Sequence, residues 1–414
     1  MTSFSDDLEK RMALFMLLFL VIAQIICLVF IPANNDVMVF FDYSQQFKAG
    51  TLFDGGAFSE YPPLAWAVII LPGLFSNDFT VYFIIFSGID VICMFLTGLM
   101  LMRICRERTR YLPILMLVYI AMTGLYFDQA IFKFDIVAVL MMTLSIDRFV
   151  SKRYCAAVAF AVIGAFIKLF PILLLPVFLI ILLKDRGELE RFMKGTAVVF
   201  GIALLLLAIL LLSGVHSDIL FGFISFQGDR GFHHESVFGT FTVIICMIFG
   251  IETTYPEAYH TLDIKNMFCD AVIGYWTFVM AAVMVLALCA IVYERSRFRD
   301  GDDKQRFIFL ISSSAILMLA FIMINKVFST QFIQWLYPLF VMMLCYRDLK
   351  QTAILSAVFI VIVLLSRAFL AISYQNMTAG QCLLFVRDIL MIYAQVVAFR
   401  TIHQMGSADD VLTE

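Results

Sequence analysis

The stretch Gly195-Thr-Ala-Val-Val-Phe-Gly-Ile-Ala-Leu-Leu-Leu-Leu-Ala-Ile-Leu-Leu-Leu-Ser-Gly214 contains twenty residues and no charged side chain. An α-helix of about 20 apolar residues is long enough to cross the hydrocarbon core of a bilayer, which is ~30 Å thick. Similar runs recur along the whole chain, and 63% of its 414 residues are hydrophobic, against roughly 45–50% in soluble domains. The sequence therefore predicts an all-α polytopic membrane protein that forms one integral membrane domain.

Apolar runs of this kind predict about twelve transmembrane helices, with both termini on the same side of the membrane. The predicted spans are 12–32, 80–102, 111–125, 135–150, 155–169, 171–183, 195–214, 271–293, 307–325, 332–345, 352–372 and 383–399. The first run follows Lys10 and Arg11 and is too long for the apolar core of a signal peptide. We therefore expect it to be a retained helix.

Basic residues are concentrated in alternate loops of this topology. One such loop carries Arg103, Arg106, Arg108 and Arg110, and other loops on the same side are also rich in lysine and arginine. Because cytoplasmic loops carry an excess of these residues, this side and both termini are predicted to face the cytoplasm. The long loops 33–79 and 215–270 are then outside, and they are predicted to form the active-site face of a plasma-membrane protein.

Each long outer loop contains an apolar piece that is too short or too interrupted to span the bilayer. These pieces are 64–75 and 237–251, and we expect both to be helices on the outer membrane surface. Pro62 and Pro63 precede the first piece. Because proline is well suited to the first turn of a helix, this pair is expected to turn the chain into it.

Motifs in the outer segments carry a family resemblance. The first loop reads Asn34-Asn-Asp-Val-Met-Val-Phe-Phe-Asp-Tyr43 and later Glu60-Tyr-Pro-Pro63. Three further motifs are Lys168-Leu-Phe-Pro171, His234-Glu-Ser-Val-Phe-Gly239 and Ser329-Thr-Gln-Phe-Ile-Gln-Trp-Leu-Tyr-Pro338. In this order they resemble the GT-C superfamily of membrane glycosyltransferases. Within it they are most similar to glycosyltransferase family 87, which comprises mannosyltransferase-like enzymes that use polyprenyl-phosphate sugars. Glu235 stands where that family usually has glutamine.

The resemblance implies a GT-C type helical bundle that transfers a hexose, with mannose favoured. The implied donor is a polyprenyl-phosphate sugar, and the implied acceptor is a glycolipid or cell-envelope glycan on the extracytoplasmic face. A hydroxyl acceptor needs a carboxylate to take its proton. Asp36 matches the position of the family's catalytic aspartate, and Asp42 is the second candidate. One carboxylate is sufficient for a single, inverting displacement, because the departing phosphate needs no proton.

Other polar residues are candidates for binding the substrates. A departing phosphate calls for nearby cations, for which the candidates are Arg230, His233, His234, Lys168 and Arg367. The candidates for other substrate contacts are Tyr43, Glu60, Tyr61, Glu235, Gln331, Gln334 and Trp335. Structural explanations also exist for several of these residues. Lys168 and Arg367 could extend to the lipid headgroups, and Trp335 could belong to an aromatic belt at the membrane interface.

Metal binding is not predicted from the residue pattern. The nine cysteines are scattered and form no Cys-x-x-Cys pair. The adjacent histidines 233 and 234 have no third ligand at a typical metal spacing, so phosphate or sugar contact is favoured for them. No cofactor is expected, and a metal ion is left open.

Two other functions compete with glycosyl transfer. A transporter or flippase of lipid-linked sugars would show inverted repeats and broken helices near the bilayer midplane. The sequence has no evident half-to-half repeat, and its polar residues gather at one face. A non-catalytic membrane protein that binds lipid is the second alternative, and turnover of a polyprenyl-phosphate sugar would distinguish the two from an enzyme.

Overall fold

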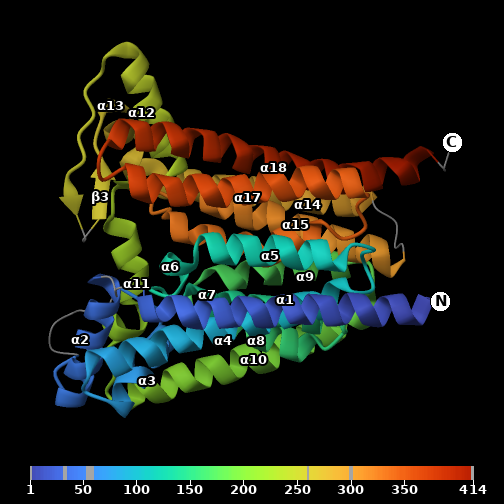
Figure 1. The fold of residues 1–414 in the computed structure, drawn as a ribbon, viewed down its shortest axis with the longest axis horizontal. Helices are drawn as coiled ribbons and strands as arrows, with labels where there is room; N and C mark the ends of the chain where they lie inside the picture. Colours follow the sequence, from blue (N-terminus) through green and yellow to red (C-terminus); the bar gives the residue numbers. More distant parts are fainter. Residues whose placement is uncertain (1, 31–34, 53–59, 259–260, 298–301, 412–414) are drawn as a thin grey trace. The chain divides into compact units, whose positions relative to one another are not determined.

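The computed structural model describes residues 2–30, 35–52, 60–258, 261–297 and 302–411 (Figure 1). Parts of the predicted outer loops, 31–34, 53–59 and 259–260, lie outside the described residues. The chain divides into two compact units, Met1–Phe226 and Gln227–Glu414. Helices dominate both units, which confirms the predicted all-α membrane class.

All regular secondary-structure elements that the structure describes in unit 1 are helices. Its elements are α1 (Thr2–Phe30), α2 (Asn35–Ala49), α3 (Pro63–Phe75), α4 (Phe79–Cys105), α5 (Leu112–Leu125), α6 (Phe127–Ala130), α7 (Asp135–Val150), α8 (Tyr154–Ile167), the 3₁₀ helix η2 (Phe170–Leu173), α9 (Leu174–Leu182), α10 (Arg186–Leu212) and most of α11 (Ser217–Asp229). Pro62 is the N-cap of α3, with Pro63 as its first residue. Proline is favoured there because the N–H groups in the first turn of a helix have no hydrogen-bond partner within the helix, so a residue without an N–H costs no bond.

The helices of unit 1 differ in how much of their surface other helices cover. Most side chains of α7 are buried, whereas α10 exposes leucines along its apolar length, such as Leu204 and Leu205. Exposed leucine on a long apolar helix fits contact with lipid chains. Inside the unit, the Tyr82 hydroxyl donates to the Ile69 carbonyl at 2.9 Å and the Tyr119 hydroxyl donates to the Met94 carbonyl at 2.7 Å. These bonds satisfy buried polar groups.

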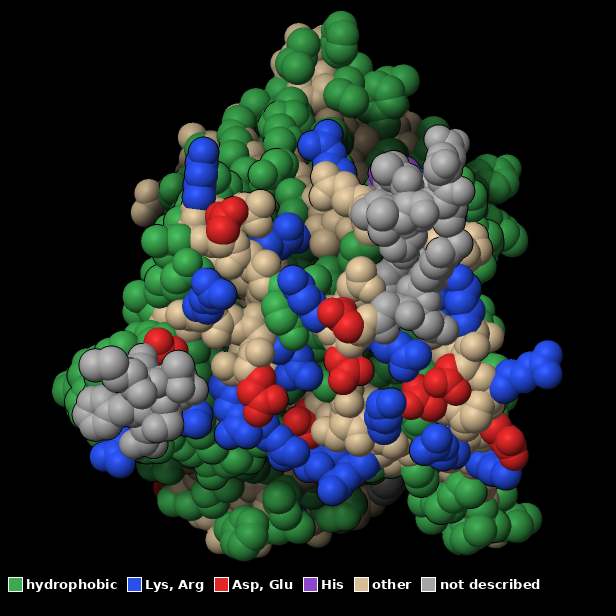
Figure 2. Space-filling view, turned by 90° about the vertical axis from the view of Figure 1, so that its right-hand side faces the viewer, with side chains coloured by type: hydrophobic (Ala, Val, Ile, Leu, Met, Phe, Trp, Pro, Cys, Tyr) green, Lys and Arg blue, Asp and Glu red, His purple; other side chains and the backbone are tan. Residues whose placement is uncertain are grey.

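A basic hollow marks one end of unit 1. It has a volume of about 330 Å³ and is lined by Lys10, Arg11, Arg103 and Arg106, together with Leu14 and Met102. Lysine and arginine side chains are numerous on this face, which Figure 2 shows. The start of α1 and the end of α4 therefore meet at one end, as the predicted topology requires. Which side of the membrane this end faces stays a prediction.

Unit 2 combines helices with a small antiparallel sheet. Its elements are β1 (Phe232–His233), α12 (Val237–Phe249), β2 (Glu257–Ala258), β3 (Thr261–Ile264), α13 (Met267–Val272), η3 (Ile273–Tyr275), α14 (Trp276–Arg297), α15 (Asp303–Ile324), η4 (Thr330–Leu336), α16 (Tyr337–Met343), α17 (Leu349–Ile372) and α18 (Met377–Val411). The strand order is β1-β3-β2. In the β1–β3 pair, Phe232 lies opposite Ile264 and His233 lies opposite Asp263.

A local apolar core fixes this sheet to the neighbouring helices. It consists of Phe232, Val243, Ile264, Cys269 and Trp276. The indole N–H of Trp276 donates to the Ile324 carbonyl at 2.9 Å, which ties the start of α14 to the end of α15. The second predicted outer loop is therefore a folded subdomain, and its sheet was not predicted from the sequence.

Seven of the predicted spans are confirmed as helices long and apolar enough to cross a membrane. They are 8–28, Phe79–Cys105, Arg186–Leu212, 267–297, Asp303–Ile324, Leu349–Ile372 and 377–405. The other five predicted spans form shorter helices, and two of them begin with a 3₁₀ segment, η2 or η4. Whether these five segments cross the membrane is untested, so the predicted total of about twelve crossings stays a prediction. The apolar pieces at 64–75 and 237–251 do form helices, α3 and α12.

Candidate functional site

Tyr61 lies at the centre of an aromatic cluster in unit 1. Its ring packs against Phe40 of α2 with a centroid distance of 6.0 Å, against Trp66 of α3 at 6.0 Å and against Phe134 at 5.2 Å, each with an edge-to-face geometry. Pro62 directly after it is extended, with φ −61° and ψ 156°, and α3 then begins. The Tyr-Pro-Pro turn therefore holds the tyrosine at the junction of three segments.

Lys168 brings a positive charge to the same cluster. It follows the last residue of α8 and has an extended backbone. Its Nζ atom lies 5.5 Å from the centre of the Tyr61 ring, 4.9 Å from that of Phe134 and 3.3 Å from Oδ2 of Asp135. The Asp135 side chain is fully buried at the start of α7. Ion pairing and cation–π attraction both stabilise this position of the ammonium group.

Asp36 occupies the first turn of α2, where a negative charge is favoured by the helix dipole. Its Oδ2 atom lies 2.8 Å from Nζ of Lys133, and its side chain is 44% exposed. It therefore has a fixed counter-ion and remains partly exposed, so an incoming group can reach it. Asp42 is also on α2 and is exposed, but six residues turn a helix by about 240° from Asp36.

Electrostatic effects connect the carboxylates of this cluster with its two tyrosines. Burial, followed by the negative charges of Glu60, Asp36 and Asp135, raises the pKa of Tyr61 well above its usual value. Burial and then Glu60 raise the pKa of Tyr43 to about 12. Both phenols thus stay protonated at neutral pH and can donate hydrogen bonds. Unit 1 therefore brings together five predicted site residues, Asp36, Tyr43, Glu60, Tyr61 and Lys168.

Two residues of this cluster, Lys133 and Asp135, were not predicted as site residues. Both lie in the segment Phe132-Lys-Phe-Asp135, at the start of a predicted apolar span. A lysine and an aspartate directly beside an apolar run are costly to bury and usually have a function. The sequence therefore marked both residues as unusual. It could not show what they contact, because their partners Asp36 and Lys168 are distant along the chain.

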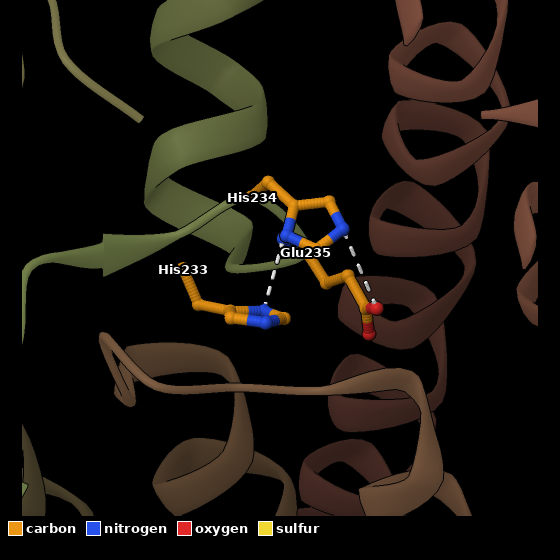
Figure 3. Close-up of side chains that lie close together, drawn as sticks. All are labelled: His233, His234 and Glu235. Carbon is orange, nitrogen blue, oxygen red and sulfur yellow. Dashed lines mark hydrogen bonds and ion pairs between the residues drawn. The ribbon is translucent and has the colours of Figure 1, made fainter. Parts of the chain in front are cut away.

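A second cluster, His233, His234 and Glu235, lies in unit 2 between β1 and α12 (Figure 3). Nδ1 of His233 is 3.0 Å from the Phe328 carbonyl oxygen, and Nδ1 of His234 is 2.9 Å from the Leu262 carbonyl oxygen. Nε2 of His234 lies 3.7 Å from Oε1 of Glu235. The three residues offer ligand atoms within 4.8 Å of one another. The prediction that this pair lacks a third ligand is therefore wrong, because the side chain of the next residue supplies one.

The backbone of this histidine cluster is held by α18. The amide of Gln381 donates to the His234 carbonyl at 2.6 Å, and Nη2 of Arg387 donates to the Glu235 carbonyl at 2.9 Å. Arg387 is itself paired with Asp388, with 2.8 Å between Nε and Oδ1. Both side chains are fully buried, so this pairing neutralises two charges inside unit 2.

The charges of the histidine cluster follow from its burial. Burial lowers the pKa of His233 to about 3 despite the nearby Glu235 carboxylate. For Glu235, burial alone raises the pKa, but the two histidines, the Thr330 N–H and Arg387 outweigh it and leave the pKa below its usual value. His233 is therefore neutral at neutral pH, so the lowered pKa of Glu235 depends on the Thr330 N–H and Arg387 rather than on a charge of His233.

The remaining predicted site residues are also in unit 2 but differ in their surroundings. Arg230 donates from Nη2 to the Thr261 hydroxyl at 2.7 Å, and Arg367 is half-buried within α17. Gln331, Gln334 and Trp335 are on η4. The Trp335 ring stacks on Phe332 with a centroid distance of 4.0 Å, and both polar side-chain atoms of Gln334 are buried without a hydrogen-bond partner among the described residues. Sugar contact by these residues stays a prediction.

Comparison with known proteins gives one match. The model of the family described as glycosyltransferase family 87 matches residues 58–323, more than half of the chain. The matched region contains Tyr61, Lys168 and the histidine cluster, whereas Asp36 precedes it and η4 follows it. No curated protein and no solved structure matches the chain.

Proposed function

Because this chain belongs to glycosyltransferase family 87 and is a membrane glycosyltransferase, we propose that it transfers a hexose, with mannose favoured, from a polyprenyl-phosphate sugar to a glycolipid or cell-envelope glycan. The reaction takes place on the outer face of the plasma membrane. A lipid-linked donor suits an enzyme with a largely apolar surface, because it can arrive within the bilayer.

The observation that carries this proposal is the meeting of two motifs in unit 1. Tyr61 of the Tyr-Pro-Pro turn and Lys168 of the Lys-x-x-Pro segment are more than a hundred residues apart, yet the ammonium group lies 5.5 Å from the centre of the ring. The carboxylate of Asp36 is close enough to raise the pKa of the same tyrosine. A base, a hydrogen-bond donor and a cation are thus gathered at one place, as glycosyl transfer from a phosphate donor requires.

The roles follow from the chemistry of the bonds. Asp36 takes the proton of the acceptor hydroxyl while the acceptor oxygen bonds to the anomeric carbon. The bond between that carbon and the phosphate oxygen breaks at the same time, and the lipid phosphate leaves as an anion. Lys168 stabilises that anion, and the Tyr61 hydroxyl donates a hydrogen bond to substrate. A single displacement inverts the anomeric configuration.

A turnover assay with a panel of donors tests the proposal. Purified protein in lipid nanodiscs is incubated with a glycolipid acceptor and with radiolabelled polyprenyl-phosphate mannose, glucose, galactose or arabinose, and nucleotide sugars serve as the control donors. We expect turnover of at least one hexosyl polyprenyl phosphate, fastest with mannose, and none of the nucleotide sugars. Turnover of nucleotide sugars alone would contradict the proposed donor class, and NMR of the product that shows a retained anomeric configuration would contradict the single displacement.

A further inference from the structure

In the histidine cluster of unit 2, two hydrogen-bond acceptor atoms face each other, Nε2 of His234 and Oε1 of Glu235. The 2.9 Å contact between Nδ1 of His234 and the Leu262 carbonyl oxygen requires a proton on Nδ1. Nε2 is then the ring atom left to bind a ligand, and it faces Oε1 of the Glu235 carboxyl group. Two acceptors inside the protein repel one another unless a positive charge lies between them. That charge is either a second proton on the ring or a metal ion.

The distance between the two acceptors favours a metal ion. Nε2 of His234 and Oε1 of Glu235 are 3.7 Å apart, whereas a charge-assisted N–H···O hydrogen bond is about 2.7–2.9 Å long. Two ligand atoms that share one metal ion at bonds of about 2.0–2.2 Å are separated by ~3.0–3.7 Å at ordinary coordination angles. The observed separation is therefore too long for a good ion-pair hydrogen bond and lies at the upper end of the range for two ligands of one ion. The three ligand atoms together lie within 4.8 Å of one another, so a bound ion would draw them closer.

The surroundings of the two rings resemble those of metal-ligating histidines. Such rings usually donate their other N–H to a carbonyl or carboxylate, which fixes the tautomer and the ring orientation. Here Nδ1 of His234 lies beside the Leu262 carbonyl oxygen. Nδ1 of His233 lies 3.0 Å from the Phe328 carbonyl oxygen and also 3.3 Å from the backbone nitrogen of Glu235. The second carboxylate oxygen of Glu235 accepts the Thr330 N–H, which leaves Oε1 directed at His234. We propose that His233, His234 and Glu235 bind a first-row divalent metal ion such as Zn²⁺ or Mn²⁺.

Two neighbouring cations, Arg387 and Lys326, are directed at groups other than the three proposed ligand side chains. Arg387 is paired with Asp388 and approaches Glu235 through the backbone carbonyl, not the carboxylate. The ammonium group of Lys326 donates to the Gly228 carbonyl at 2.6 Å. The imidazole ligands distinguish this site from one for Mg²⁺ or Ca²⁺, which prefer oxygen ligands alone.

Three protein ligands leave coordination positions open on such an ion. A substrate oxygen can occupy such a position, a role that rests on the proposed function. Metal binding does not depend on the proposed function, so an experiment can contradict the metal site or the function without contradicting the other.

Metal content of the purified full-length protein is the direct test. Protein stripped with a chelator is incubated with Zn²⁺ or Mn²⁺, desalted and measured by inductively coupled plasma mass spectrometry. The variants are His234→Ala and Glu235→Gln, and His216→Ala is the matched control because His216 is an exposed histidine in the same predicted loop. Glu235→Gln retains an oxygen that can accept the Thr330 N–H, so it should keep the local fold.

We expect about one metal ion per chain in the wild-type protein and in His216→Ala, and at least a tenfold loss of bound metal in the other two variants. Less than one tenth of an equivalent in the wild-type protein, or unchanged metal content in a folded Glu235→Gln protein, would overturn the metal site. Full transfer activity in metal-free protein would leave the proposed function intact and remove the catalytic role of the ion. Metal binding without any transfer would support the metal site and contradict the proposed function.

Discussion

The cluster around Tyr61 and the histidine cluster differ in how their polar groups are stabilised within an apolar protein. In the first, charges are neutralised by side chains on other segments, as in the Asp36–Lys133 and Asp135–Lys168 pairs. In the second, the rings and carboxylate are held by backbone groups, among them the Phe328 and Leu262 carbonyls. Side-chain pairs can exchange partners when a charged substrate arrives, whereas groups held by the backbone keep their geometry. This difference suits proton transfer in the first cluster and fixed ligand binding in the second.

The largest effect should come from the exposed carboxylate of the first cluster. We expect Asp36→Asn to lower kcat by about 10²–10⁴-fold, because the change keeps the shape and removes the base. Donor binding, measured by equilibrium binding of the polyprenyl-phosphate sugar, should change little. Asp42→Asn is the matched control on the same helix and should retain activity. An active Asp36→Asn protein together with an inactive Asp42→Asn protein would move the role of base to Asp42.

Removal of both imidazoles from the second cluster should have the next largest effect. We expect His233→Ala/His234→Ala to lower turnover by on the order of 10²-fold, the loss typical of a preorganised electrostatic contact. The thermal unfolding midpoint shows whether the protein still folds. Wild-type activity in a folded double variant would show that the histidine cluster takes no part in turnover.

The Lys168–Asp135 pair allows its structural and catalytic roles to be separated. Lys168→Met takes a counter-ion from a buried carboxylate, and we expect it to destabilise the protein by roughly 2 kcal/mol and to lower turnover. A second change, Asp135→Asn, should restore stability because the buried charge is gone, but it should not restore turnover. Recovery of both properties in the double variant would show that Lys168 is needed only for the fold.

A change in the scaffold of the second cluster should have the smallest effect. Asn266 caps α13, and its side-chain oxygen accepts the N–H groups of Phe268 and Cys269. We expect Asn266→Ala to reduce the free energy of unfolding by about 1 kcal/mol, while Asn266→Ser should retain an oxygen that caps the helix. Denaturation in mild detergent measures both variants, and a loss of activity larger than the loss of stability would show that the cap also positions the histidines.

Several features of the candidate site could be predicted from the sequence because their signals are local. Asp36 follows the first apolar run, and the Pro62–Pro63 pair does begin a helix. The match to glycosyltransferase family 87 confirms the resemblance inferred from the motifs. The small sheet escaped prediction, because two of its strands have only two residues and the third has four. Such short segments show no alternation that could distinguish a strand from a turn.

The sequence by itself determined that this is a helical membrane protein, because long uncharged runs can satisfy their backbone hydrogen bonds in a bilayer only by forming helices or closed barrels, and runs of about 20 residues have the length of a spanning helix. It also determined the family, through short motifs. Only the tertiary structure decided which charges meet. Lys133 finds Asp36 and Lys168 finds Asp135 across long stretches of chain, because ion pairs depend on distances of a few ångströms between side chains that no periodicity along the chain encodes. For the same reason, the ring orientations of His233 and His234 depend on carbonyl partners that only the tertiary structure places beside them, Phe328 O in the segment before η4 and Leu262 O in β3.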